Sequence, residues 1–119
     1  MAKRILVADD DRRVSELVKV RLEDSGYSVI TAFDGEEALE QVKHGRPDLL
    51  ILDVNMPKLD GDQVYMTLHA APETKALPIL MLTGLRSEAE IAAEADPNMF
   101  AKPVKFDKLL GRIRELIGE

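Results

Sequence analysis

The chain contains Leu49-Leu50-Ile51-Leu52-Asp53-Val54-Asn55-Met56-Pro57, an apolar run that ends at a carboxylate and passes directly into a turn. A strand that is buried on both faces of a parallel sheet has this continuous apolar pattern, without alternating polar residues. Open parallel sheets bind their ligands just beyond the carboxyl ends of such strands. We therefore expect Asp53 to lie where a ligand binds.

Strand and helix patterns alternate on both sides of this run. The predicted strands are 5–8, 27–32, 49–53, 79–83 and 99–101, and a helical pattern follows each of them. Five such units predict a doubly wound α/β fold, an open five-stranded parallel sheet with helices on both faces. The small size favours the flavodoxin-like strand order 2-1-3-4-5.

Local signals mark where two of the helices begin and where one ends. Two capping-box patterns, Asp34 with Glu37 and Ser87 with Glu90, predict the starts of the second and fourth helices. The pair Asp96-Pro97 stops the fourth helix soon after it begins, because proline cannot continue a helix. We therefore expect five helices, with helix four short or atypical.

Composition limits the possible classes of protein. Of the 119 residues, 45% are hydrophobic and 32% are charged, which is typical of a globular protein, and we expect one domain over residues 1–119. The absence of cysteine excludes disulfides, thiolate metal sites and cysteine nucleophiles. A net charge of −6 without a basic cluster argues against direct nucleic-acid binding. No apolar run approaches the roughly 18 residues of a membrane span, and a signal peptide is missing, so we expect a soluble, cytoplasmic protein.

The predicted topology gathers polar residues at one edge of the sheet. The carboxyl ends of strands one, three, four and five would bring together Asp9, Asp10, Asp53, Thr83 and Lys102. Neighbouring carboxylates repel one another unless a cation joins them. A pocket of oxygen donors favours a hard ion, and Mg²⁺ fits best. The charges of three carboxylates, Mg²⁺ and the lysine would balance.

This combination of groups also indicates a reaction. Mg²⁺ and a lysine commonly hold a phosphoryl group, and a carboxylate can be the nucleophile that receives it. Asp53 is the expected acceptor, because its strand is central. Thr83 could donate a hydrogen bond to the arriving group, and the small Gly84 beside it leaves room for entry.

The residues and their order resemble the receiver domains of two-component response regulators, relatives of the bacterial chemotaxis receiver. The matching motifs are the pair Asp9-Asp10, the stretch 53–61, Thr83-Gly84 and Lys102-Pro103, and the resemblance covers the whole chain. It implies phosphoryl transfer to Asp53 from a histidine kinase or a phosphotransfer protein.

The resemblance also implies roles for individual residues. Asp9, Asp10, Asp53 and the backbone carbonyl of Asn55 would hold Mg²⁺. Thr83 and Lys102 would contact the phosphoryl group, and the peptide bond before Pro103 would be cis.

As a receiver, the chain would act as a signalling switch and not as a turnover enzyme. It would catalyse its own phosphorylation and dephosphorylation at Asp53, and the new charge would reshape a protein-binding face built from helix four, strand five and helix five. We expect a monomer or a weak, phosphorylation-dependent dimer. No effector domain is expected within this chain, which is either a stand-alone receiver or an excised piece of a longer regulator.

The chain departs from the family pattern near its fourth helix. The segment between Thr83 and Lys102 is about one helical turn shorter than the family leads us to expect. The switch aromatic of the family lies three residues before the lysine, where this chain has Met99, whereas Phe100 lies two before it. Because strand side chains alternate between faces, Phe100 should point the other way unless a bulge shifts the register. Met99 and Phe100 therefore both remain candidates for the switch residue.

Leu85, two residues after Thr83, suggests a slow reverse reaction. Our hypothesis is that this apolar side chain hinders an attacking water and lengthens the life of the acyl phosphate.

Other interpretations compete with the receiver. Taken singly, Asp9 and Asp10 could belong to a solvated loop in which Asp11 caps a helix. A hydrolase of the haloacid-dehalogenase type would also use an aspartate nucleophile, but it carries a second aspartate two residues later, where this chain has Asn55. A degenerate receiver that binds proteins without phosphorylation is the remaining alternative. The two histidines, His44 and His69, have no metal-ligand partners at suitable spacing and are expected on the surface.

Overall fold

A computed structural model describes residues 2–118 of the chain. The strands are β1 (Arg4–Ala8), β2 (Ser28–Ala32), β3 (Leu49–Asp53), β4 (Ile79–Thr83) and β5 (Met99–Ala101). The helices are α1 (Arg12–Asp24), α2 (Gly35–Gly45), α3 (Gly61–Ala70), α4 (Glu88–Glu94) and α5 (Phe106–Ile117). Strands and helices alternate along the chain, as the sequence predicts.

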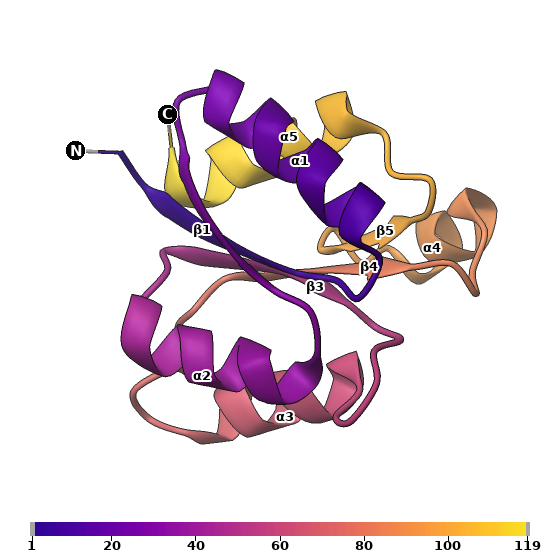
Figure 1. Cartoon of the computed structure of the whole chain (residues 1–119). Helices are drawn as coiled ribbons and strands as arrows, with labels where there is room; N and C mark the ends of the chain where they lie inside the picture. The colour runs from indigo at the N-terminus through magenta and orange to yellow at the C-terminus, as the bar shows by residue number, and fades with distance from the viewer. Residues whose placement is uncertain (1, 119) are drawn as a thin grey trace.

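The strands form a parallel sheet in the order β2-β1-β3-β4-β5, which confirms the predicted flavodoxin-like topology. Figure 1 shows α1 and α5 on one face of the sheet, α2 and α3 on the other, and α4 near β5 at the sheet's edge. The carboxyl ends of β1, β3 and β4 therefore meet at one end of the sheet. None of the helices within residues 2–118 is both long and apolar enough to cross a membrane.

The central strand β3 is buried at all five positions. Its side chains alternate between two cores: Leu50 and Leu52 pack on the side of α2 and α3, and Leu49 and Ile51 on the side of α1 and α5. A shift of one residue would exchange the two sets, so the register of a doubly buried strand is strongly specified. The same packing therefore fixes Asp53 at the strand's carboxyl end.

Two helix starts show how well the capping signals predict structure. Ser87 and Glu90 form the expected reciprocal capping box at α4. At α2, the Asp34 carboxylate accepts a hydrogen bond from the Glu37 N–H, at 2.8 Å, as expected. However, the Glu37 carboxylate accepts from the N–H of Phe33, at 2.6 Å, and not from that of Asp34. The Asp34 half of the predicted capping box is therefore confirmed and the Glu37 half is wrong, because the Glu37 carboxylate bonds to the residue before the N-cap.

Helix α4 has seven residues, which confirms the expected short helix. It ends at Ala95, whose φ of 55° places it in the left-handed region, and Asp96-Pro97 follows. Ile91 is its buried residue. The helix therefore depends on its cap and on one apolar anchor.

The pairing of β4 with β5 shows which face of the sheet Phe100 occupies. Phe100 pairs with Leu82, and both pack in the core on the side of α1 and α5. Met99 pairs with Met81, and both pack on the side of α2 and α3. Since Thr83 is two residues from Met81, it shares the face of Met99. The expectation that Phe100 faces away from Thr83 is confirmed.

Candidate functional site

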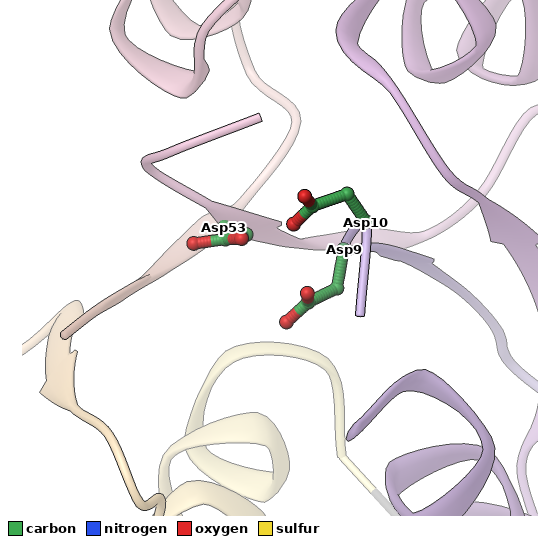
Figure 2. A group of neighbouring side chains, drawn as sticks. All are labelled: Asp9, Asp10 and Asp53. Atoms are coloured by element: carbon green, nitrogen blue, oxygen red, sulfur yellow. The ribbon is translucent and has the colours of Figure 1, made fainter. Parts of the chain in front are cut away.

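The end of the sheet holds three carboxylates. Asp9 and Asp10 follow β1, and Asp53 is the last residue of β3. One oxygen from each lies within 4.8 Å of the others. Figure 2 shows the side chains of Asp9 and Asp10 extending from the end of β1 on the side of Asp53. Asp9 and Asp53 are buried, whereas Asp10 is exposed. The topology thus brings the three predicted acids together.

Backbone groups hold the two buried carboxylates in place. The N–H of Asp11 donates a hydrogen bond to Asp9 Oδ1, at 2.9 Å. The N–H of Asn55 donates to Asp53 Oδ1, at 3.2 Å. In each case one oxygen is used for local anchoring, and the second oxygen of the carboxylate is left for other partners.

The ammonium of Lys102 lies between the two buried carboxylates. Its Nζ is 3.0 Å from Asp9 Oδ2 and 3.3 Å from Asp53 Oδ2. The Lys102 N–H donates to the Thr83 carbonyl, at 2.8 Å, which fixes the start of the side chain at the end of β5. The following peptide bond, Lys102–Pro103, is cis, as the family resemblance implies. A backbone hydrogen bond and ionic contacts with the two buried carboxylates therefore both hold Lys102 at the site.

Burial changes the acidity of these groups. Burial and the charge of Asp9 raise the pKa of Asp53 to about 6, although the Lys102 ammonium and the Asn55 N–H act in the opposite direction. Burial alone would lower the pKa of Lys102, but its hydrogen bonds and charge interactions with Asp9 and Asp53 raise it overall. The lysine stays protonated at neutral pH, and it cannot compensate three carboxylates.

The donor set fits a hard divalent cation. All three side chains offer oxygen only, the preference of Mg²⁺. Asp9 Oδ2 is buried and accepts no well-aligned hydrogen bond, although the Lys102 ammonium is close to it. The cluster also carries two negative charges beyond those that Lys102 balances. A divalent cation bound by oxygens of the three carboxylates would balance the excess charge.

Thr83 and Gly84 form the β4 side of the site. Thr83 is buried at the end of its strand, and its Oγ1 accepts a hydrogen bond from the Leu85 N–H, at 3.1 Å. This bond leaves the hydroxyl proton free to be donated. A methyl group placed on Gly84 would meet no atom within 4 Å, so open space adjoins Thr83. Leu85, the residue after Gly84, is 77% exposed.

The two histidines lie on helices, away from the carboxylates. His44 pairs with Glu40 on α2, with 3.0 Å between Nε2 and Oε2. His69 stacks on Tyr65 in α3, with 5.6 Å between ring centroids. Both have surface partners, in agreement with the sequence analysis.

Sequence reasoning missed the turn between β2 and α2, which contacts the loops on both sides of it. Phe33 lies under the Arg12 guanidinium, 4.0 Å from the ring centroid. Gly35 packs directly against the backbone of Leu59. The signal that could have found this contact is the glycine immediately after the Asp34 cap, since a helix seldom begins with glycine without a steric reason.

Comparisons with known proteins give one consistent result. The family model described as the response regulator receiver domain matches residues 5–114. Response regulator MprA of Mycobacterium bovis is 44% identical over 120 aligned positions, which cover 98% of this chain and 51% of the relative. MprA of Mycobacterium leprae is 46% identical over 117 positions, covering 96% and 50%. The chain spans about half the length of these curated relatives.

Solved structures agree with this result. Chemotaxis response regulator CheY4 of Vibrio cholerae has a TM-score of 0.83 and 32% identity, over 98% of this chain and all of that one. The receiver domain of Francisella response regulator 1452 has a TM-score of 0.83 and 29% identity, over 96% and 95% of the two chains.

Proposed function

The chain belongs to the family of response regulator receiver domains, a family of phosphorylation-dependent signalling switches, and from this we propose that Asp53 accepts a phosphoryl group in a Mg²⁺-dependent transfer. We take residues 1–119 as a single receiver domain. The observation that carries the proposal is the Lys102 ammonium, which contacts both Asp9 and Asp53 within the carboxylate cluster.

Asp53 is suited to act as the nucleophile. A phosphohistidine of a histidine kinase or of a phosphotransfer protein is the proposed donor. An ionised carboxylate oxygen of Asp53 attacks the phosphorus atom, a P–O bond forms and the P–N bond breaks. The electron pair of that bond goes to the imidazole nitrogen, which then takes up a proton. With a pKa of about 6, Asp53 is mainly ionised at neutral pH and therefore ready to react.

Asp9, Asp10, Asp53 and the Asn55 carbonyl would hold Mg²⁺, which when bound neutralises charge on the phosphoryl oxygens. Lys102 supplies a further positive charge beside Asp9 and Asp53. Once Asp53 is phosphorylated, this ammonium exchanges its contact with the carboxylate for one with a phosphoryl oxygen. The Thr83 hydroxyl, whose proton is free, donates to another phosphoryl oxygen.

We propose that these new bonds move Thr83 and the loops after β3 and β4. The output face would then be the surface of α4, β5 and α5. A hollow of about 250 Å³ lies there, lined by residues that include Ile91, Met99, Phe100 and Lys108. A downstream protein partner that binds this face would sense the phosphorylation state. We propose that the domain acts in the cytoplasm and binds no nucleic acid directly.

The site favours a switch over a hydrolase. A hydrolase that uses an aspartate nucleophile needs an acid or base beside the leaving group. The residue two positions after Asp53 is Asn55, whose amide cannot transfer a proton in this way. We therefore expect one slow cycle of phosphorylation and hydrolysis at Asp53, without rapid release of phosphate from many substrates.

Chemical mapping of the modified residue tests the proposal. The chain is incubated with phosphoramidate, a small donor with a P–N bond, in the presence of Mg²⁺. Borohydride then reduces an aspartyl phosphate to homoserine, and peptide mass spectrometry locates the change. Homoserine at position 53 is the expected result. Homoserine elsewhere would refute Asp53 as the acceptor, and its complete absence would favour the phosphorylation-independent binding module.

A further inference from the structure

We propose that the turn between β2 and α2, residues 33–35, is a positioning element for the metal site. The turn supplies no ligand, but it contacts both the loop that carries Asp9 and Asp10 and the loop that carries Asn55. In Figure 1 the end of β1, the start of α2 and the chain after β3 lie at the same end of the sheet. The inference deepens the proposed function, since it concerns the same Mg²⁺ site.

The first set of contacts joins the end of β2 and the turn to residues 9 and 12, which flank Asp10 and Asp11. The N–H of Asp9 donates to the Ala32 carbonyl, at 3.1 Å, at the very end of the β1–β2 ladder. Three residues further along the chain, the Arg12 guanidinium stacks on Phe33, 4.0 Å from the ring centroid. A cation–π contact of this geometry is favourable. Asp9 is thus bonded to the end of β2, and Arg12, at the start of α1, lies against Phe33 of the turn.

The second contact joins the turn to the loop after β3. Gly35 lies so close to Leu59 that a Cβ on it would overlap the Leu59 carbonyl oxygen and come within 2.7 Å of the carbonyl carbon. Main-chain atoms cannot rotate away as a flexible side chain can. Any side chain at position 35 would therefore push residues 58–60 outward.

An ion pair reinforces this contact. Lys58 Nζ is 3.5 Å from Asp34 Oδ2, while Asp34 Oδ1 caps α2. Lys58 has a φ of 67°, a left-handed conformation that costs energy for a residue with a side chain. One carboxylate thus anchors both the start of α2 and a strained position of the neighbouring loop.

The base of the same loop, where Val54 and Gly61 meet, is also held together by close main-chain contacts. The N–H of Gly61 donates to the Val54 carbonyl, at 2.8 Å, and a Cβ on Gly61 would lie 2.5 Å from the Asp53 carbonyl oxygen. Asn55 lies between this closed base and the contact at Leu59. Because this hydrogen bond holds the base of the loop together, we expect a displacement at Leu59 to be taken up by the residues in between, which include Asn55.

The consequence concerns metal choice. Mg²⁺ demands near-ideal octahedral geometry with short bonds, whereas Ca²⁺ accepts longer bonds and irregular geometry. A loop that moves outward should therefore weaken Mg²⁺ binding more than Ca²⁺ binding. A merely structural role would lower stability without changing the preference between the two ions.

The test compares Gly35→Ala with Gly111→Ala, a glycine-to-alanine change in α5 where the new methyl group meets no atom within 4 Å. Backbone amide NMR shifts are followed during titration with MgCl₂ and, separately, CaCl₂, without a phosphoryl donor. Gly35→Ala should raise the Mg²⁺ dissociation constant by about tenfold, the lower end of the range for changes to groups that orient metal ligands. Its Ca²⁺ constant should change less than about threefold, and Gly111→Ala should match wild type for both ions.

Lys58→Met is the second variant, and it tests the positioning role of the turn if Gly35→Ala does not fold. Loss of a positive charge makes the chain more negative, and this by itself would strengthen Mg²⁺ binding. Loss of the contact with Asp34 predicts the reverse, a rise of the Mg²⁺ dissociation constant by about two- to threefold. The two explanations therefore predict changes of opposite sign.

The proposal is overturned if Gly35→Ala binds Mg²⁺ as Gly111→Ala does, if both ions weaken equally, or if Lys58→Met binds Mg²⁺ more tightly. A failure of the proposed function would look different. In that case wild type itself would show no Mg²⁺-dependent shifts that Asp10→Asn removes, and both proposals would fall together.

Discussion

Thr83 and Phe100 lie on opposite faces of the sheet, because β4 and β5 pair Thr83 with Ala101 and Leu82 with Phe100. A movement of Thr83 toward a phosphoryl group therefore does not open space for the Phe100 ring. Met99 shares the face of Thr83 and packs against the core on the side of α2 and α3.

We accordingly expect Met99 to report phosphorylation. Phosphorylation of Asp53 should shift the methyl resonance of Met99 in protein with ¹³C-labelled methionine methyl groups, and Thr83→Val should abolish most of this shift. Phe100→Leu serves as the control and should leave it in place. A large change at the Phe100 ring with a constant Met99 methyl signal would contradict this assignment.

Asp53→Asn should stabilise the metal-free protein at neutral pH. The folded-state pKa of Asp53, about 6, lies above the value of about 4 in an unfolded chain, so the folded state binds more protons between these values. Its contribution to stability therefore falls as pH rises from 4 to 6 and stays low above that. The variant should gain about 2 kcal/mol in free energy of unfolding at pH 7.5 and much less at pH 4.

Urea unfolding at the two pH values, with chelator present, measures this difference. Asp62→Asn, on the exposed side of α3, provides a control in which one acid is also lost. An equal effect of Asp53→Asn at both pH values would show that burial of its charge is not the cause.

Lys102→Met should destabilise the metal-free protein. Without the ammonium, Asp9 and Asp53 remain buried with no cationic side chain between them, a loss of about 2 kcal/mol for a partly exposed pair. The loss should shrink at pH 5, where Asp53 takes up a proton. Mg²⁺ should also reduce it by supplying the missing positive charge.

Lys108→Met is the matched control, because Lys108 forms an exposed ion pair with Glu88 at 3.6 Å. Such pairs contribute little, so the change should stay below about 0.5 kcal/mol. Similar losses in the two lysine variants would argue against a special role for the ammonium in the site.

Leu85→Glu should shorten the life of the phosphorylated state several-fold. Leu85 is exposed beside Thr83, and a carboxylate there could orient an attacking water or accept its proton. The decay of phosphorylated protein after removal of the donor gives the rate. Leu85→Ala tests whether size alone matters, and an unchanged rate in Leu85→Glu would refute the hypothesis that the leucine hinders water.

Much of the fold could be predicted from short patterns. The apolar run before Asp53 identifies the central strand, because only a doubly covered strand buries every position. The topology then places Asp9, Asp53 and Lys102 together without any knowledge of distances. The face of Phe100 followed from simple alternation, since β5 pairs with β4 in a regular register.

The contacts around the site could not be predicted in this way. Gly35 and Leu59 meet only after α2 and the loop following β3 have packed, so the glycine after the Asp34 cap suggests a close approach but does not identify Leu59 as its partner. The left-handed conformation of Lys58 is equally hidden, because lysine has no preference for it. The spacing of Asp34 and Glu37 predicts a capping box, but the Glu37 carboxylate accepts a hydrogen bond from the N–H of Phe33 and not from that of Asp34. Side-chain reach and tertiary packing decided these cases.

The most direct test of the account is intact-mass spectrometry after incubation with acetyl phosphate, with and without Mg²⁺, on wild type and Asp53→Asn. We expect a gain of about 80 Da, one phosphoryl group, only in wild type and only with Mg²⁺. An adduct of the same mass on Asp53→Asn, or no adduct on wild type at early time points with Mg²⁺ bound, would contradict it.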